Sequence, residues 1–200
     1  MSAVRNLGAG ALVLGLAAPF VGSPYGAGPQ LDIDAMAAAI EAGDDHVSAL
    51  QLAQWIKDRK ANLRVIDVRS PEAFAAFSIP SAENIPLQAI GRTAFSPDDT
   101  VVLYSEEGAH AAQAWVFLRA RGVGKVFFIA GGLADWRDEV MSPVLPADAS
   151  AEAVAAFEPV AELSQYFGGS PVTGPAGAAA TQMVSTNAAD DLSRLRRRGC

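Results

Sequence analysis

Apolar residues in the middle of the chain follow two patterns, which together predict strands that alternate with helices. Mostly apolar runs over residues 63–68, 101–104 and 125–129, of which 101–104 is continuous, are typical of strands that are buried on both faces. Between these runs, and up to about residue 121, apolar positions recur three and four residues apart, as on one face of a helix. This order favours an α/β fold with a mostly parallel central sheet and helices on both faces.

Capping residues indicate where two of these helices begin. Ser48 can cap a helix that carries Leu52 and Ile56 on one face. Ser70 precedes Pro71, and proline is favoured at the first helical position. Both helices are therefore expected to start directly after a serine.

The amino terminus has the composition of an export signal. Arg5 is followed by an uncharged apolar run over residues 7–22. Four glycines and Pro19 make this run a weak helix for a soluble core. We interpret residues 1–28 as a signal peptide or as an N-terminal membrane anchor with its transmembrane helix at 7–22. Because Arg5 stays inside, the rest of the chain is expected to be exported, in a periplasmic or extracytoplasmic location.

The remaining chain divides into three parts by composition. Residues 29–44 form a short helical lead-in that stops at Gly43, and residues 45–146 contain the predicted α/β domain. Alanine, proline and glycine then dominate residues 147–200, which we interpret as a C-terminal tail ending in an arginine cluster and Cys200.

Charge and cysteine content exclude several classes of function. The chain has 15 Lys plus Arg against 22 Asp plus Glu, a formal net charge of −7, so a broad nucleic-acid-binding face is not expected. A single cysteine excludes an internal disulfide and a Cys-x-x-Cys site, and His46 and His110 are too few for a histidine-rich metal site. No metal and no cofactor are predicted.

Two segments of the predicted domain resemble the signatures of the rhodanese-like domain family. Residues 65–87 read VIDVRSPEAFAAFSIPSAENIPL, in which a strand ends in Asp-x-Arg followed by Ser-Pro-Glu. Residues 101–136 contain a second strand, a loop, a helix, a third strand and a closing Gly-Gly-x-x-x-Trp motif. The pieces occur in the family's order over roughly residues 46–145. The resemblance implies the family's three-layer fold.

The resemblance also implies a site for a sulfur atom. In this family, a six-residue loop after the central strand directs its amides at a cysteine, and the next helix points its positive end at the same place. The cysteine takes sulfur from a donor such as thiosulfate, becomes a persulfide and passes the sulfur on. An arginine at the sixth loop position helps to hold the anionic donor.

The corresponding loop in this chain departs from that pattern; its residues are Ser105, Glu106, Glu107, Gly108, Ala109 and His110. Ser105 stands where the family has its cysteine, and His110 where it often has arginine. A hydroxyl has a pKa far above the value of about 8.5 for a thiol, and oxygen cannot form a persulfide. Glu106 and Glu107 are expected to repel thiosulfate. The sequence therefore predicts a sulfurtransferase-like pseudoenzyme loop to which no catalytic residue is assigned.

Four residues are candidate ligand-binding positions: Asp67, Arg69, Ser105 and His110. One alternative is a hydrolase triad of Ser105, His110 and Asp67. It is disfavoured because the sixth residue of a tight loop usually lies at its rim. The simpler interpretation of Asp67 and Arg69 is a structural ion pair at the end of a strand.

The sole cysteine lies at the opposite end of the chain. Cys200 follows Arg194, Arg196, Arg197 and Arg198, which would lower a thiol pKa and attract anionic sulfur compounds. A terminal cysteine on a flexible arm resembles a bacterial sulfur carrier. The alternatives are an intermolecular disulfide that joins two chains, an adventitious thiol, and an arginine cluster that lies against anionic lipid.

Two functions follow from these observations. The first is an exported, catalytically inactive rhodanese-like module that binds a partner or a small anion through its loop. The alternative, in sulfur metabolism, is a persulfide carrier or sulfurtransferase that works through Cys200, together with a sulfur-transfer protein as partner.

Overall fold

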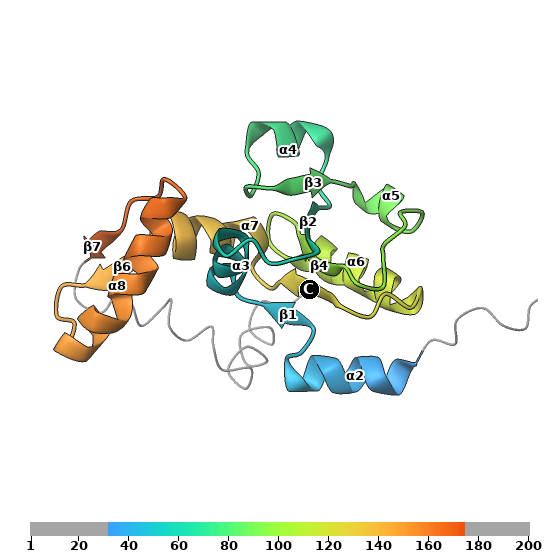
Figure 1. Ribbon diagram of the computed structural model, residues 1–200, viewed down its shortest axis with the longest axis horizontal. Coiled ribbons are helices and arrows are strands. Elements are labelled where there is room, and N and C mark those ends of the chain that lie inside the picture. The colour runs from blue at the N-terminus through green and yellow to red at the C-terminus, as the bar shows by residue number, and fades with distance from the viewer. Residues whose placement is uncertain (1–31, 175–200) are drawn as a thin grey trace, which may run out of the picture. The chain divides into compact units, whose positions relative to one another are not determined.

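A computed structural model describes residues 32–174 of the chain (Figure 1). The helices and strands in this part are, in order, α2 (Ile33–Ala42), β1 (His46–Val47), α3 (Ala49–Lys57), β2 (Leu63–Asp67), α4 (Pro71–Ala76), β3 (Ala82–Asn84), α5 (Leu87–Ile90), β4 (Thr100–Tyr104), α6 (Ala109–Ala120), β5 (Val126–Ile129), α7 (Gly132–Asp135), the π-helix η2 (Trp136–Met141), β6 (Val144–Pro146), α8 (Ala151–Tyr166) and β7 (Val172–Gly174).

Five of the described strands form one parallel sheet in the order β1-β5-β4-β2-β3. Strand β4 lies in the centre and is buried along its whole length. Its register with β2 places Asp67 opposite Tyr104, so both strands end at the same edge of the sheet. In a parallel sheet the loops after these carboxyl ends are the usual place for a site.

Alternate residues of the central strands point into two separate hydrophobic clusters. On one face, Val65 and Val102 pack with residues of α3, α7, η2 and α8. On the other face, Ile66 and Leu103 pack with residues of α5 and α6. Helices therefore cover both faces of a parallel sheet, which confirms the predicted three-layer α/β fold.

The predicted caps are present. The Ser48 hydroxyl accepts a hydrogen bond from the Gln51 backbone N–H at 3.1 Å, and the Ser70 hydroxyl accepts one from Ala73 at 3.3 Å. The lead-in helix α2 ends at Gly43, whose φ of 74° lies in the left-handed region that favours glycine.

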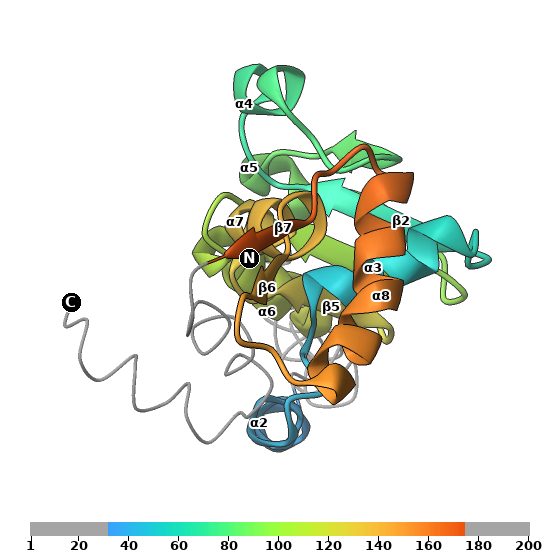
Figure 2. The same ribbon diagram turned by 90° about the vertical axis from the view of Figure 1, so that its left-hand side faces the viewer.

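The packed structure continues past residue 146, where the sequence places the start of the tail. Helix α8 lies beside α3 (Figure 2) and buries Leu163 in the cluster of the α3 face. Strand β7 pairs in parallel with β6 in a separate two-stranded sheet. Residues 147–174 therefore pack against the domain, because apolar residues spaced along an alanine-rich helix give it a surface to bury.

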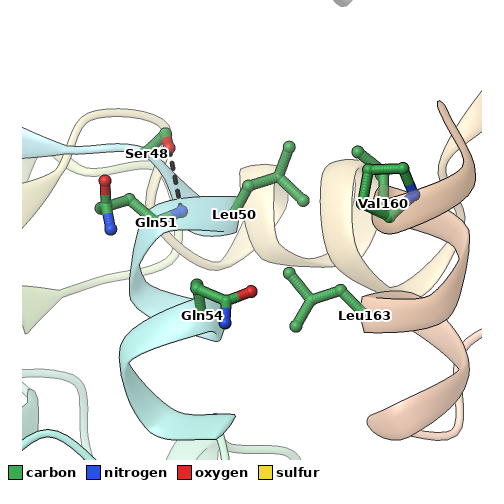
Figure 3. A pocket seen from close by; sticks show the side chains of 7 residues that line it. Ser48, Leu50, Gln51, Gln54, Val160 and Leu163 are labelled. Carbon is green, nitrogen blue, oxygen red and sulfur yellow. Dashed lines mark hydrogen bonds between the residues drawn. The ribbon is translucent and has the colours of Figure 1, made fainter. Parts of the chain in front are cut away.

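Helices α3 and α8 leave a groove between them with a volume of about 340 Å³. Figure 3 shows the side chains that line it, which are Ser48, Leu50, Gln51, Gln54, Pro159, Val160 and Leu163.

Several predictions concern residues outside the described range. The signal peptide or anchor at 1–28, the arginine cluster and Cys200 all lie there. Within residues 32–174, no helix has the length and apolar character needed to cross a membrane.

Candidate functional site

The six residues from Ser105 to His110 follow the central strand β4, and the last two of them, Ala109 and His110, already begin α6. Ser105 is 2 % exposed, and Gly108 is also buried, whereas Glu106, Glu107, Ala109 and His110 are exposed. Gly108 has φ of 84°, and a Cβ atom there would lie 1.7 Å from the carbonyl oxygen of Ala130. Only glycine fits this position, because both the backbone conformation and the space exclude a side chain.

The loop is held in shape by the amino end of α7. The backbone N–H of Leu133 donates to the Ser105 carbonyl at 2.8 Å, and that of Ala134 donates to the Glu106 carbonyl at 3.2 Å. Gly132 permits this approach, since a Cβ atom there would lie 2.3 Å from the Ser105 carbonyl oxygen. Gly132 also has φ of 64°, a conformation that favours glycine.

The Ser105 hydroxyl points to the amino end of α6. Its Oγ accepts a hydrogen bond from the backbone N–H of Ala111 at 3.3 Å. In the part of the chain that the structure describes, the Ser105 hydroxyl is therefore paired with this amide and not with His110. The side chain at the first loop position thus lies where the helix amino terminus favours negative charge.

The hydrolase triad is not assembled. Asp67 is completely buried, and its carboxylate accepts hydrogen bonds from the backbone N–H of Arg69 at 2.8 Å and from that residue's Nε and Nη2. With Asp67 engaged in this way and His110 exposed at the rim, the three residues do not form a proton relay.

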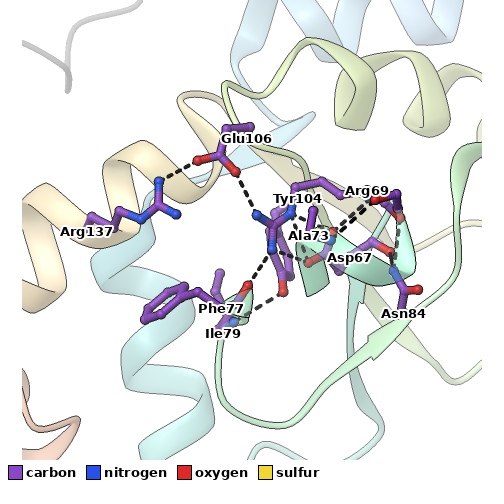
Figure 4. Close-up of polar contacts among 10 residues, drawn as sticks. Asp67, Arg69, Ala73, Phe77, Ile79, Asn84, Tyr104, Glu106 and Arg137 are labelled. Carbon is purple, nitrogen blue, oxygen red and sulfur yellow. Dashed lines mark hydrogen bonds and ion pairs between the residues drawn. The ribbon is translucent and has the colours of Figure 1, made fainter. Parts of the chain in front are cut away.

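Asp67 and Arg69 form the structural pair that the sequence predicts (Figure 4). Arg69 Nη2 lies 2.7 Å from Asp67 Oδ2 and also donates to the Phe77 carbonyl at 2.6 Å. The side-chain amide of Asn84 donates to the carbonyl oxygens of both Asp67 and Arg69. The hydrogen bonds that Arg69 donates to the Asp67 carboxylate raise the pKa of Arg69, so its guanidinium stays charged. The pair fixes the turn after β2.

Glu106 lies between two guanidinium groups, a relationship that the sequence does not predict. Its Oε2 lies 2.6 Å from Arg69 Nη1, and its Oε1 accepts a hydrogen bond from Arg137 Nη1. Partial burial raises the pKa of Glu106, but the hydrogen bonds from Arg137 and Arg69 outweigh this effect and the pKa is lowered. The expected repulsion of anions by Glu106 is therefore offset by the two cations.

Arg137 is the residue that the sequence analysis missed. It follows the closing Gly-Gly-x-x-x-Trp motif directly and begins the exposed side of η2, where its guanidinium lies 5.4 Å from the centroid of the Phe77 ring. Glu107, the loop residue next to Glu106, is exposed. Within residues 32–174, no group of three or more His, Cys, Asp or Glu residues is placed to hold a metal ion.

The fully buried ring of Tyr104 lies next to Arg69, with the guanidinium carbon 5.7 Å from the ring centroid. Its hydroxyl accepts a hydrogen bond from the backbone N–H of Ile79 at 3.2 Å. Burial raises the pKa of Tyr104, and the nearby Asp67 carboxylate adds to this, so the phenol stays neutral. Segment 77–80 is thus held by a buried tyrosine.

Comparisons with known proteins agree with this architecture. The sequence profile of the rhodanese-like domain matches residues 48–139. A sulfurtransferase from Allochromatium vinosum is 30% identical over 104 residues, which cover 51% of this chain and 96% of that protein.

Solved structures of rhodanese-like proteins also match. A human single-domain sulfurtransferase is 26% identical with a TM-score of 0.42, and the match covers 46% of this chain and 94% of that one. A rhodanese-like domain from Anabaena is 22% identical with a TM-score of 0.43, covering 46% of this chain and 73% of that one. On the sequence profile and the sulfurtransferase relative, the chain belongs to the rhodanese-like domain family.

Proposed function

We propose that this protein is an exported rhodanese-like module that does not transfer sulfur at its own loop and instead binds a partner or a small anion there. The observation that carries the proposal is the buried Ser105, whose hydroxyl occupies the first loop position beside the amino end of α6. In the family this position holds the sulfur-carrying cysteine.

The chemistry of the hydroxyl supports the lack of activity. A thiol with a pKa near 8.5 becomes a thiolate readily beside a helix amino terminus, whereas a serine hydroxyl stays protonated at neutral pH. Sulfur transfer needs an S–S bond at the enzyme, which oxygen does not supply. The loop retains a buried polar group and nearby cations, so binding without turnover is the function that fits the residues present.

A cyanide–thiosulfate turnover assay on the full chain tests this proposal. We expect no thiocyanate above the uncatalysed rate. Thiocyanate formation that persists in Cys200→Ser but is lost in Ser105→Ala would overturn the proposal, because the loop would then be a working centre.

The alternative function, sulfur transport on Cys200, is favoured by the four arginines that precede this cysteine in the sequence. Incubation with polysulfide followed by mass spectrometry of the C-terminal peptide tests it. A gain of one sulfur atom on Cys200, and turnover that disappears in Cys200→Ser, would rank this function first. A thiol that stays free and unmodified would remove it.

Export is part of the proposal and rests on the charge and hydropathy of residues 1–28. Mass spectrometry of the intact protein from the cell envelope tests it. Recovery in the envelope fraction, with or without the leader, supports export, and recovery of full-length protein in the cytoplasmic fraction alone contradicts it.

A further inference from the structure

Two guanidinium groups from distant parts of the sequence converge on one carboxylate beside the loop. Arg69 follows β2 and Arg137 belongs to η2, and each directs its Nη1 atom to a different oxygen of Glu106. Figure 4 shows Glu106 between them. This arrangement of donors is the one by which arginines bind the oxygen atoms of carboxylates, phosphates and sulfates.

Both cations are positioned by contacts that do not involve Glu106. Arg69 is 9% exposed in its side chain and is held by the Asp67 carboxylate and the Phe77 carbonyl, which leaves Nη1 directed outward. Arg137 is half-exposed and lies over the ring of Phe77. A carboxylate-sized anion at this point therefore meets one donor, Arg69, that is already in place, and a second, Arg137, that lies close by, so little ordering of Arg69 is needed.

The Glu106 carboxylate is much more exposed than the side chain of Arg69. Its side chain is 50% exposed, and the hydrogen bonds described for its carboxylate are those to Arg69 and Arg137. A change of side-chain rotamer would place the carboxylate in solvent. The charges of Asp67, Arg69 and Arg137 then sum to +1, which is the sign that attracts an anion.

We propose that Arg69 and Arg137 form a binding site for a small tetrahedral oxoanion of the sulfate, thiosulfate or phosphate type, and that Glu106 closes this site as an internal ligand. The proposal rests on the proposed function, which it deepens by naming the groups that hold the anion. Two oxygens of such an anion replace the two carboxylate oxygens. The site uses side chains of the β2 turn and η2, and is separate from the amide beside Ser105.

The internal ligand sets the concentration at which an external anion binds. Because Glu106 is tethered to the loop, its carboxylate competes at an effective concentration on the order of millimolar or higher. The unmodified protein should therefore bind free oxoanions weakly, and loss of the carboxylate should open the site.

Isothermal titration of the full chain with sodium sulfate, phosphate and thiosulfate in low-chloride buffer tests the proposal. We expect Glu106→Ala to bind at least one of these anions about tenfold more tightly than the unmodified protein. Glu107→Ala is the matched control: it removes the same charge one residue away and should leave the affinity close to that of the unmodified protein. Circular dichroism and thermal melting establish that each variant is folded.

A second variant tests the arginine directly. Arg137→Gln in the Glu106→Ala background should return the affinity to the weak level. Equal gains in Glu106→Ala and Glu107→Ala, no gain in folded Glu106→Ala, or full retention of the gain without Arg137 would each overturn the proposal. Sulfur turnover at Ser105 is a different readout: its detection would overturn the proposed function, whereas absent anion binding without turnover would overturn this site alone.

Discussion

The ring of Trp136 meets the ring of Phe167 edge to face, with the centroids 5.2 Å apart and the planes inclined by 73°. Trp136 ends the Gly-Gly-x-x-x-Trp motif and is fully buried, while Phe167 follows α8. This contact joins the segment after residue 146 to the same cluster that supports the loop at Ser105. Leu163 and Phe167 of this segment therefore pack into the domain's core.

Replacing Phe167 with alanine should lower the free energy of unfolding by about 2 kcal/mol, because a half-buried ring and its aromatic contact are lost. Urea denaturation measures the change. Val154→Ala, at a position on α8 that is 40% exposed, is the control and should cost less. Equal effects of the two substitutions would mean that α8 does not depend on the Trp136 contact.

Replacing Gly108 with alanine should destabilise the protein by about 2 kcal/mol or more, since the new Cβ would overlap the Ala130 carbonyl and the residue has positive φ. Gly124→Ala is the matched control, because no atom lies within 4 Å of a Cβ at that position. Thermal melting compares the two variants. A Gly108→Ala protein as stable as Gly124→Ala would show that the loop does not have the described shape.

Replacing Ser105 with cysteine in a Cys200→Ser background should create a protein that gains one sulfur atom from polysulfide at position 105. The thiol would lie beside the Ala111 amide and the amino end of α6, which lowers its pKa. Mass spectrometry of the intact protein detects the addition, with Cys200→Ser alone as the control. A folded variant whose thiol stays unmodified would mean that more than the serine prevents sulfur binding.

Stability should fall as the pH rises from about 4.5 to about 7, owing to Glu139. Burial, aided by the charges of Asp135 and Asp138, raises the pKa of Glu139 to about 7, against 4.5 for an ordinary glutamate. In this range the folded state thus binds a proton that the unfolded state has released. The contribution of this proton to the free energy of unfolding is full below pH 4.5 and lost above pH 7.

Glu139→Gln should remove this dependence and stabilise the protein at pH 8 by roughly 2 kcal/mol relative to the unmodified chain. Urea denaturation at pH 5 and pH 8 measures the difference between the pH values in each protein. Glu158→Gln, at an exposed position on α8, is the control. Identical pH dependence in Glu139→Gln and the unmodified chain would contradict the assignment.

The central part of the fold could be predicted because its signals are local. Strands β2, β4 and β5 are mostly apolar runs, and Ser48 and Ser70 cap helices through contacts three residues away. The pairing of Asp67 with Arg69 spans two residues, so the sequence was enough to predict it.

The parts that could not be predicted depend on contacts between distant residues. Helix α8 is rich in alanine and contains Pro159, so its weak apolar face becomes visible only against α3. The charge of Glu106 is evident in the sequence, but its neutralisation needs Arg69 and Arg137, which lie 37 and 31 residues away. Arg137 follows no recognisable pattern of its own.

The backbone hydrogen bonds from Leu133 and Ala134 to the loop have an evolutionary consequence. They hold the carbonyl groups of residues 105 and 106 whatever side chains those residues carry. A single codon change at position 105 can therefore exchange a nucleophile for an inert group, or restore it, without remodelling the backbone. Ancestry and reactivity are separable in this scaffold, and relatives that differ at this one position are the natural place to look for the transition.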